Sequence, residues 1–214
     1  MMNKEKWSAF WKEYDYPALN KMGYNIEKGA LRKVFDEIGI SKDTIIIDFG
    51  CGEGRTLSYL REFGFRNSIG VDNSMDAIRR CQQRGFKENN DVFFVGGKLK
   101  TKCDLLFSEG LLEHYKKKDL DGVINKMVQS ADKYLFLVQP LTKSLTFRMM
   151  EFIERHTGRF WDYVNEYDYD IGEFIDAFKK HGFVPILIKT VHNLPQFLDT
   201  SIFLVFQKNK KKRG

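Results

Sequence analysis

The order of apolar segments in this 214-residue chain predicts an α/β fold, with a parallel β-sheet that carries helices on both faces. Two observations support this prediction. Short β-branched segments alternate along the chain with segments whose apolar residues recur every three or four positions. In addition, residues 45–47 are all isoleucine, which is typical of a strand buried on both faces of a parallel sheet.

Two helices are predicted before that strand. Trp7, Phe10, Trp11 and Tyr14 stand at helical spacing and form an aromatic stripe on one helical face. A second helix is predicted over residues 30–38, where apolar residues repeat at the same spacing. The aromatic stripe has two interpretations, core packing or a lid at the rim of a binding pocket.

A glycine-rich loop follows the strand predicted at residues 45–48. Asp48 ends the strand, and Gly50, Gly52 and Gly54 let the backbone turn sharply and approach a ligand closely. A helix is predicted directly afterwards, over residues 55–63. A strand, a glycine loop and a helix in this order predict a site for a nucleotide-like cofactor at the carboxyl end of the strand.

The residues around the loop discriminate between cofactor classes. A dinucleotide fingerprint that starts at Gly50 would need a glycine where this chain has Arg55. The carboxylate of Asp48 suits the ammonium of a methionine moiety, whereas it would repel a pyrophosphate. A strand predicted over residues 68–72 ends on Asp72, whose carboxylate can accept both hydroxyls of a ribose. NAD enzymes share that last feature, so Asp72 supports an adenosyl ligand without choosing between cofactors, and the choice depends on Asp48 and the glycine spacing.

The spacing D-x-G-x-G-x-G resembles motif I of the class I S-adenosylmethionine-dependent methyltransferases. The segment C-D-L-L-F-S-E-G-L-L-E-H-Y at residues 103–115 is similar to the fourth-strand segment of the small-molecule, methyltransferase type 11-like family. The resemblance covers residues 28–140. It implies S-adenosyl-L-methionine as the cofactor and a Rossmann-like, seven-stranded, mostly parallel sheet with an antiparallel last strand. The implied strand order is 3-2-1-4-5-7-6.

The resemblance also implies which residues hold the cofactor. The family commonly places an acid after the third strand to hold the adenine amino group, and this chain has Gly97 there. A backbone group or a neighbour such as Lys98 or Asn90 would substitute. The implied cofactor-binding residues are Asp48, Gly50, Cys51, Gly52, Gly54, Asp72, Asn73, Gly97, Lys98, Ser108 and Glu109.

The remaining elements continue the alternation of strands and helices. Helices are predicted over residues 74–84, 119–130, 144–156 and 171–181. Strands are predicted over residues 92–95, 104–108, 134–139, 185–191 and 201–207, with the last two forming an antiparallel hairpin. Aromatic and basic residues outside the cofactor half are the candidates for acceptor contacts, namely Trp11, Tyr14, Tyr16, Arg148 and Trp161.

His114 is the candidate general base. It follows the fourth predicted strand, where it would face the cofactor pocket, and an imidazole titrates near neutral pH. A base is needed only if the acceptor must lose a proton. The alternative is a histidine that hydrogen-bonds the backbone and shapes the pocket.

Length and composition favour one globular domain over residues 1–207. We expect N-terminal helices or a lid over residues 1–40, a cofactor half over 41–139 and a substrate-side cap with the end of the sheet over 140–207. A basic tail at 208–214 supplies five of the excess positive charges, so the body of the chain is nearly neutral despite its net charge of +6. Nucleic acid is therefore an unlikely partner.

The sequence also predicts where the protein is located and the state of its cysteines. Residues 1–6 lack the apolar core of a signal peptide and the longest apolar runs are strand-length, so we expect a cytoplasmic protein without a membrane segment. Cys51, Cys81 and Cys103 match no disulfide or metal-ligand spacing, so reduced thiols and no metal are expected. Cys51 is interpreted as a residue that fills space in the loop.

The predicted function is methyl transfer from S-adenosyl-L-methionine to a small-molecule acceptor. Two alternatives stay open, a methyltransferase acting on protein or RNA and a non-catalytic S-adenosylmethionine-binding protein. The segment after the fourth strand lacks the D/N-P-P-Y type of sequence, which argues against methylation of nucleic-acid amines. Neither the acceptor atom nor the oligomeric state follows from the sequence.

Overall fold

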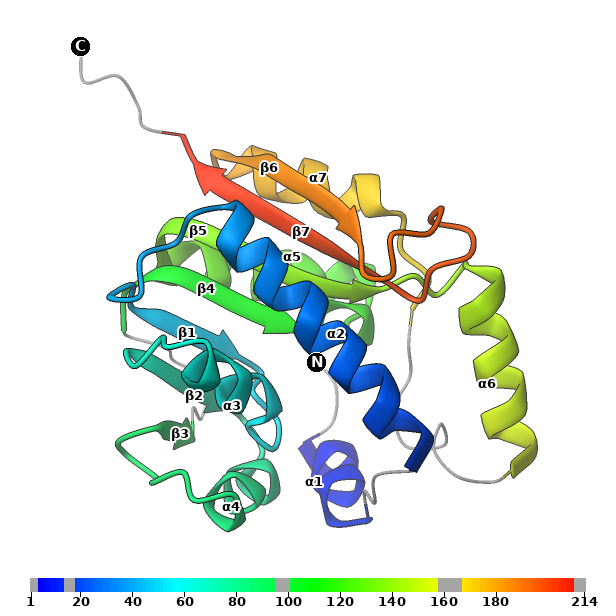
Figure 1. The fold of residues 1–214 in the computed structure, drawn as a ribbon, viewed down its shortest axis with the longest axis horizontal. Helices are drawn as coiled ribbons and strands as arrows, with labels where there is room; N and C mark the ends of the chain where they lie inside the picture. Colours follow the sequence, from blue (N-terminus) through cyan, green and yellow to red (C-terminus); the bar gives the residue numbers. More distant parts are fainter. Residues whose placement is uncertain (1–3, 14–17, 95–100, 158–166, 210–214) are drawn as a thin grey trace.

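A computed structural model describes residues 4–13, 18–94, 101–157 and 167–209. Within these ranges seven strands form one sheet in the order β3-β2-β1-β4-β5-β7-β6 (Figure 1). The strands are β1 (Ile46–Phe49), β2 (Ser68–Asp72), β3 (Val92–Phe94), β4 (Cys103–Glu109), β5 (Ala131–Pro140), β6 (Phe183–Thr190) and β7 (Ser201–Lys208). The strand order is the one that the family resemblance implied.

The strand directions confirm the predicted fold class. Strands β1 to β5 pair in parallel, whereas β7 pairs antiparallel with both β5 and β6. Two antiparallel pairings in succession turn β6 back into the direction of β1 to β5. The carboxyl ends of six strands and the beginning of β7 therefore meet at one edge of the sheet, which we call the carboxyl edge.

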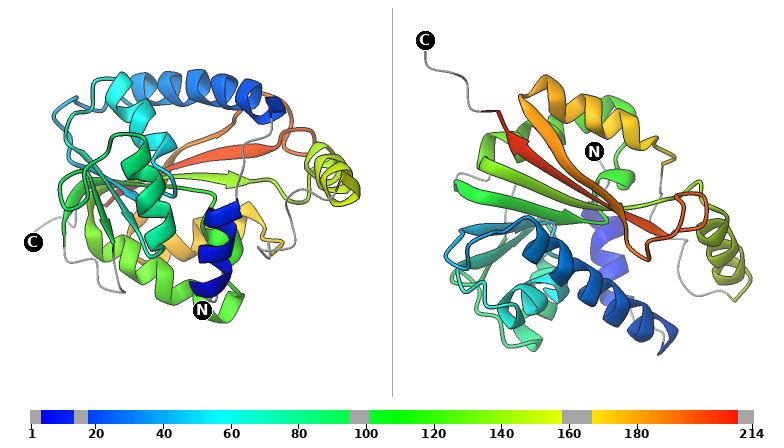
Figure 2. Two further views of the ribbon diagram at one scale, coloured as in Figure 1. Left: turned by 90° about the horizontal axis from the view of Figure 1, so that it is seen from below. Right: turned by 45° about the horizontal axis from the view of Figure 1, so that its top comes forward.

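Helices cover both faces of the sheet (Figures 1 and 2). On one face lie α2 and α3, and on the other lie α5 and α7. The helices are α1 (Lys4–Glu13), α2 (Ala18–Glu37), α3 (Arg55–Glu62), α4 (Met75–Gln83), α5 (Lys117–Ser130), α6 (Leu145–Thr157) and α7 (Ile171–Lys180), with a short 3-10 helix η1 (Leu112–His114).

Alternating side chains of the strands supply the two layers of the core. Ile46 packs in a cluster with Leu31 and Phe35 of α2, whereas its neighbour Ile47 packs in the opposite cluster with Ile124 of α5. This division follows from the two-residue period of a strand. Because both faces are covered, the middle strands are buried on both sides, as the apolar runs predicted.

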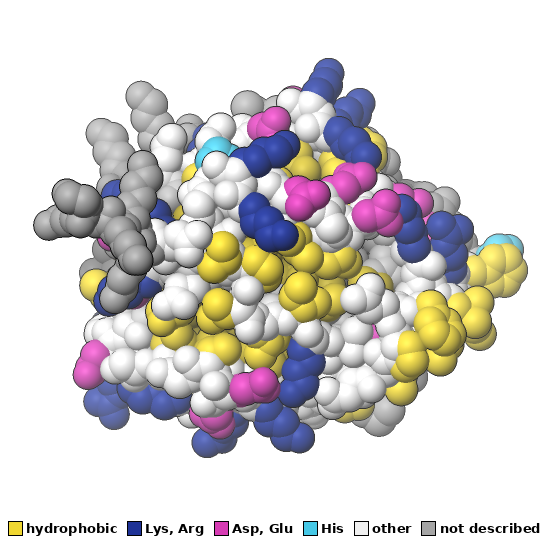
Figure 3. All heavy atoms as spheres, turned by 90° about the horizontal axis from the view of Figure 1, so that it is seen from above, with side chains coloured by type: hydrophobic (Ala, Val, Ile, Leu, Met, Phe, Trp, Pro, Cys, Tyr) yellow, Lys and Arg dark blue, Asp and Glu magenta, His cyan; other side chains and the backbone are white. Residues whose placement is uncertain are grey.

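Two helices lie beside the carboxyl edge without covering the sheet. Helix α1 packs against α4, where Ser8 hydrogen-bonds Asp76. Helix α6 projects from the body, and Figure 3 shows its hydrophobic side chains on the surface, together with others over β6. Phe152 on α6 is 63% exposed, and Ile188 on β6 is 46% exposed.

Several predicted boundaries were wrong, among them the start of β5, which begins at Ala131 and not at residue 134. Ile45 precedes β1 and is 47% exposed, because it lies at the amino end of the strand beyond the buried layer. The helix predicted over residues 30–38 is the second half of α2, whose first half also carries apolar residues at helical spacing, Leu19, Met22 and Ile26, that the prediction did not include. Strand β6 begins at Phe183, two residues early. The division into lid, cofactor half, cap and tail stays a prediction.

No helix among the described residues is long and apolar enough to cross a membrane. All three cysteines are buried free thiols.

Candidate active site

The glycine loop lies at the carboxyl end of β1 and has a left-handed backbone. The φ angles of Gly50, Gly52 and Gly54 are 81°, 54° and 79°, a region that side chains with a Cβ rarely adopt. Space is also short at Gly52, because a Cβ there would lie 2.6 Å from the indole of Trp11. The loop therefore needs glycine for its shape and for the close approach of α1.

Asp72 at the end of β2 ties this loop to the next one. Its Oδ2 accepts a hydrogen bond from the Gly52 amide at 3.0 Å, and its Oδ1 accepts one from the Ser74 amide at 2.8 Å. Burial raises the pKa of Asp72 to about 6, against the opposing effect of the amides of Ser74, Gly52 and Asn73. Each carboxylate oxygen can accept a second hydrogen bond, so ribose hydroxyls could still bind there.

Asp48 is a buried carboxyl group without a full set of partners. The residue is 2% exposed, and its Oδ2 has no hydrogen-bond partner within the described part of the chain. Burial, followed by the nearby charge of Asp72, raises the pKa of Asp48 to about 8, and Arg55 opposes the shift. Such a group costs free energy unless a cation or donor pairs with it.

The end of β4 completes this part of the edge. The Ser108 hydroxyl donates to the Phe49 carbonyl at 2.8 Å and so ties β4 to β1. Glu109 pairs with Arg55 and accepts a hydrogen bond from the Thr56 hydroxyl at 2.6 Å. In this structure both side chains bind the protein itself, and Glu109 fixes the first turn of α3 beside the glycine loop.

These residues fit an adenosyl cofactor with an amino acid end. The loop leaves room for backbone contact, Asp72 retains acceptor capacity, and the unpaired oxygen of Asp48 matches an ammonium group. Residues 24–188 match the sequence profile of a family described as a methyltransferase domain. The chain belongs to this methyltransferase family.

Solved structures similar to this methyltransferase share its fold. Magnesium protoporphyrin IX methyltransferase (ChlM) from Synechocystis PCC 6803 with bound SAH gives a TM-score of 0.69 at 17% identity, over 96% of this chain and 94% of that one. The DhpI–SAH complex gives 0.67 at 12% identity, over 97% and 96%. The mitomycin 7-O-methyltransferase MmcR gives 0.61 at 14% identity, over 86% and 53%. No curated protein matches the methyltransferase in sequence.

His114, the predicted base, lies in η1 just after β4. Its Nε2 atom is 3.6 Å from Oε1 of Glu113, and its ring makes an edge-to-face contact with Trp7 at 5.1 Å between centroids. Glu113 is 4% exposed, and burial raises its pKa to about 8. Glu113 was not among the site residues predicted from the sequence.

Helix α1 brings aromatic residues to the carboxyl edge. Trp7, Phe10 and Trp11 are all half-buried, with Trp7 against His114 and Trp11 against Gly52. This position agrees with either interpretation of the aromatic stripe, so the assignment of Trp11 to the acceptor stays a prediction. Tyr14, Tyr16, Gly97, Lys98 and Trp161 lie outside the described residues.

The remaining predicted site residues among those described are Arg148, Cys51 and Asn73. Arg148 on α6 is exposed and lies 3.6 Å from the Asp168 carboxylate, a partner outside the predicted cofactor site. Cys51 is buried, and a hydrogen bond with Cys81, followed by burial, raises the pKa of its thiol. A thiol that resists ionisation is a poor nucleophile, which favours the space-filling interpretation. Asn73 is exposed after β2.

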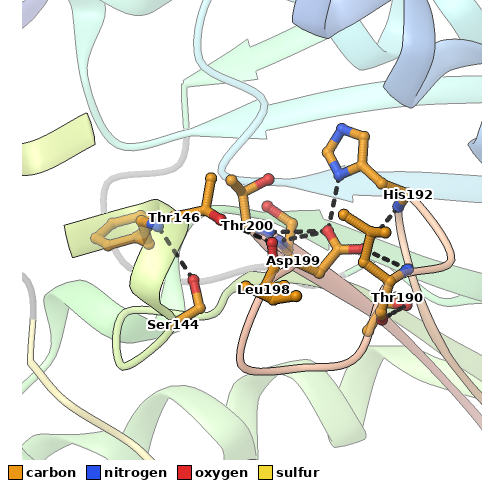
Figure 4. Close-up of polar contacts among 10 residues, drawn as sticks. Ser144, Thr146, Thr190, His192, Leu198, Asp199 and Thr200 are labelled. Atoms are coloured by element: carbon orange, nitrogen blue, oxygen red, sulfur yellow. Dashed lines mark hydrogen bonds and ion pairs between the residues drawn. The ribbon is translucent and has the colours of Figure 1, made fainter. Parts of the chain in front are cut away.

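A second polar centre, which was not predicted from the sequence, lies in the loop between β6 and β7 (Figure 4). The carboxylate of Asp199 is fully buried, and its Oδ1 lies 2.7 Å from Nδ1 of His192. Its Oδ2 accepts a hydrogen bond from the His192 amide at 2.8 Å, and its Oδ1 accepts one from the Thr200 amide at 2.8 Å. A histidine and an aspartate seven residues apart in a loop give no sequence signal for this arrangement.

Proposed function

We propose that this methyltransferase transfers the methyl group of S-adenosyl-L-methionine to a small-molecule acceptor. The observation that carries the proposal is the unpaired, buried oxygen of Asp48 directly before the glycine loop. A buried carboxyl group of this kind needs a positively charged partner to ionise, and the methionine end of the cofactor has an ammonium group.

Three elements would hold the cofactor. Asp48 would bind the ammonium, the glycine loop would approach the cofactor through its backbone, and Asp72 would accept the ribose hydroxyls. The cofactor supplies an electrophilic sulfonium methyl group, so the protein's main task is positioning. Holding two reactants in line can lower a barrier by about 7–11 kcal/mol.

His114 is our candidate for the residue that accepts a proton from the acceptor. It lies at the carboxyl edge, and the ring of Trp7 and the carboxyl group of Glu113 fix its surroundings. An imidazole in such a place can accept a proton near neutral pH. Helix α1 closes over the glycine loop at Trp11, which would exclude water from the reacting groups.

A small-molecule acceptor has support from the fold and the comparisons. The names of two similar structures specify magnesium protoporphyrin IX and mitomycin as the molecules that those enzymes methylate. In this chain α1 and the β6–β7 loop lie on either side of the carboxyl edge and could surround a small acceptor there.

Calorimetry with S-adenosyl-L-methionine and S-adenosylhomocysteine tests this function. We expect both to bind with a stoichiometry of one. Asp72→Ala should weaken binding by about 1.5–3 kcal/mol, the usual contribution of a charge-assisted hydrogen bond. Asp170→Ala, on the exposed surface, is the matched control. A folded protein that binds neither ligand would contradict the proposal.

A further inference from the structure

Helix α6 carries exposed apolar side chains along one of its faces. Large apolar residues stand at positions 145, 149, 152 and 153, which lie on the same side of a helix. We call these four, together with a phenylalanine of the β6–β7 loop, the α6 face, and each exposes 56–65% of its surface: Leu145, Met149, Phe152, Ile153 and Phe197. Figure 3 shows hydrophobic side chains of the projecting helix on the surface. A group of exposed apolar side chains of this kind marks a place of contact with another molecule.

The start of α6 is fixed to the β6–β7 loop. The Leu145 amide donates to the Phe197 carbonyl at 2.9 Å, and the Thr146 hydroxyl donates to the Leu198 carbonyl at 2.8 Å (Figure 4). The Ser144 hydroxyl caps the helix by accepting a hydrogen bond from an amide of the first turn at 3.1 Å. The β6–β7 loop itself lies at the carboxyl edge, because β6 runs in the direction of β1. The α6 face therefore has a defined place beside the edge that carries the glycine loop.

The size and composition of the α6 face argue against a stable protein partner. A helix of 13 residues is about 20 Å long, so a face about 10 Å wide presents about 200 Å². A stable protein interface needs about 800 Å² from each partner, with hydrogen bonds and with Trp, Tyr or Arg at its centre. The α6 face consists of leucine, methionine, isoleucine and phenylalanine side chains, which cannot hydrogen-bond. Such a surface suits a fluid apolar phase.

The charges around the α6 face are balanced. Arg148 on the helix lies 3.6 Å from the Asp168 carboxylate, and Lys143 just before the helix lies 2.8 Å from the Asp170 carboxylate. The helix sequence contains two arginines and two glutamates. A border without excess charge complements an electrically neutral surface, whereas a polyanion such as RNA would require a positive one.

We propose that the α6 face inserts into the surface of a zwitterionic phospholipid bilayer. A helix with one apolar face lies in the plane of the interface, with its apolar side chains below the headgroups. With 13 residues α6 is shorter than the about 20 residues that a membrane-spanning helix needs, so it would lie on the bilayer. Burial of the five side chains removes their apolar surface from water. The contact would hold the carboxyl edge of the sheet beside the bilayer.

Flotation of the full chain with phosphatidylcholine vesicles tests the proposal. This lipid has no net charge, so the basic residues at 208–213 cannot drive binding. We expect the protein to bind the vesicles and to stay bound at about 1 M salt, where the screening length is about 3 Å. A protein that stays unbound at about 1 mM lipid, or that leaves the vesicles when salt is added, would overturn the proposal.

Two double variants locate the contact. Met149→Gln with Phe152→Gln should lower the vesicle affinity at least about tenfold, because two large side chains of the α6 face become polar. Glutamine is a good helix former, so α6 should persist. Ile186→Gln with Ile188→Gln is the matched control, because these apolar side chains are also exposed but lie on β6. The control should bind vesicles as the unchanged protein does, and an equal loss in both double variants would contradict the proposal. Circular dichroism would check that both variants fold.

Sedimentation without lipid tests a second copy of the chain as the occupant. We expect a protein that does not associate through α6. A dimer that dissociates in the Met149→Gln, Phe152→Gln variant would assign the α6 face to self-association and overturn the lipid contact. Neither measurement uses S-adenosylmethionine, so failure of the proposed function and failure of this inference are distinguishable.

Discussion

Asp48 and Asp199 are both buried carboxyl groups at the carboxyl edge of the sheet, yet their surroundings are opposite. Asp199 in the β6–β7 loop accepts hydrogen bonds from four amides and an imidazole, and its pKa is lowered. Asp48 beside the glycine loop has an unpaired oxygen and a pKa raised to about 8. The chain satisfies Asp199 by itself, whereas Asp48 needs a ligand. One carboxylate thus organises a loop, and the other marks a binding site.

Asp199→Ala should have the largest effect on stability. It removes an acceptor of five hydrogen bonds and leaves several loop amides without a partner. We expect the free energy of unfolding to fall by about 3–5 kcal/mol, measured by urea denaturation at pH 7. Because the folded pKa of Asp199 is lowered, its contribution is present above the unfolded pKa and disappears as the pH falls through the folded pKa.

Asp168→Ala is the matched control for that variant, since Asp168 is exposed and pairs only loosely with Arg148. It should change stability by less than about 0.5 kcal/mol. Equal losses in the two variants would mean that the bonds of Asp199 are no more important than a surface ion pair.

Gly52→Val should remove cofactor binding. The new side chain meets the indole of Trp11 and a backbone with φ of 54°, so the loop or α1 must move. We expect the affinity for S-adenosylhomocysteine to fall by about 100-fold or more. Gly85→Val is the control, because Gly85 also has a positive φ but no atom lies within 4 Å of its Cβ position. Circular dichroism would show whether each variant folds.

Asp48→Asn should stabilise the free protein, the opposite sign to Asp199→Ala. The folded pKa of about 8 is above the unfolded value of 3.8, so Asp48 lowers stability as the pH rises between these values. At pH 7 the asparagine variant should gain about 1–3 kcal/mol in the free energy of unfolding, and less at pH 5. A variant that is destabilised at both pH values would show that the Asp48 oxygen is satisfied.

The sequence predicted the binding site around Asp48, but it did not predict the buried polar cluster around Asp199. Asp48 and the glycines are contiguous, and Asp72 ends the next strand of a parallel sheet, so the chemistry could be read along the chain. His192 and Asp199 lie in a loop between two strands, where no apolar repeat marks a buried polar group. The first half of α2 was predictable, because Leu19, Met22 and Ile26 stand at helical spacing, but the prediction began the helix only at residue 30. The exposure of Ile45 could not be predicted from the sequence either, because Ile45 continues the apolar run of the buried isoleucines that follow it.

The central claim is that Asp48 binds the cationic end of the cofactor. The most direct test is to measure proton release when the cofactor binds. Free Asp48, with a pKa of about 8, is protonated at pH 6.5 and must ionise to pair with an ammonium. Calorimetry with S-adenosylhomocysteine at this pH, in two buffers of different ionisation heat, measures the protons released. The account predicts release of nearly one proton by the unchanged protein and a loss of most of that release in Asp48→Asn. The same proton count in both proteins, or none in either, would contradict it.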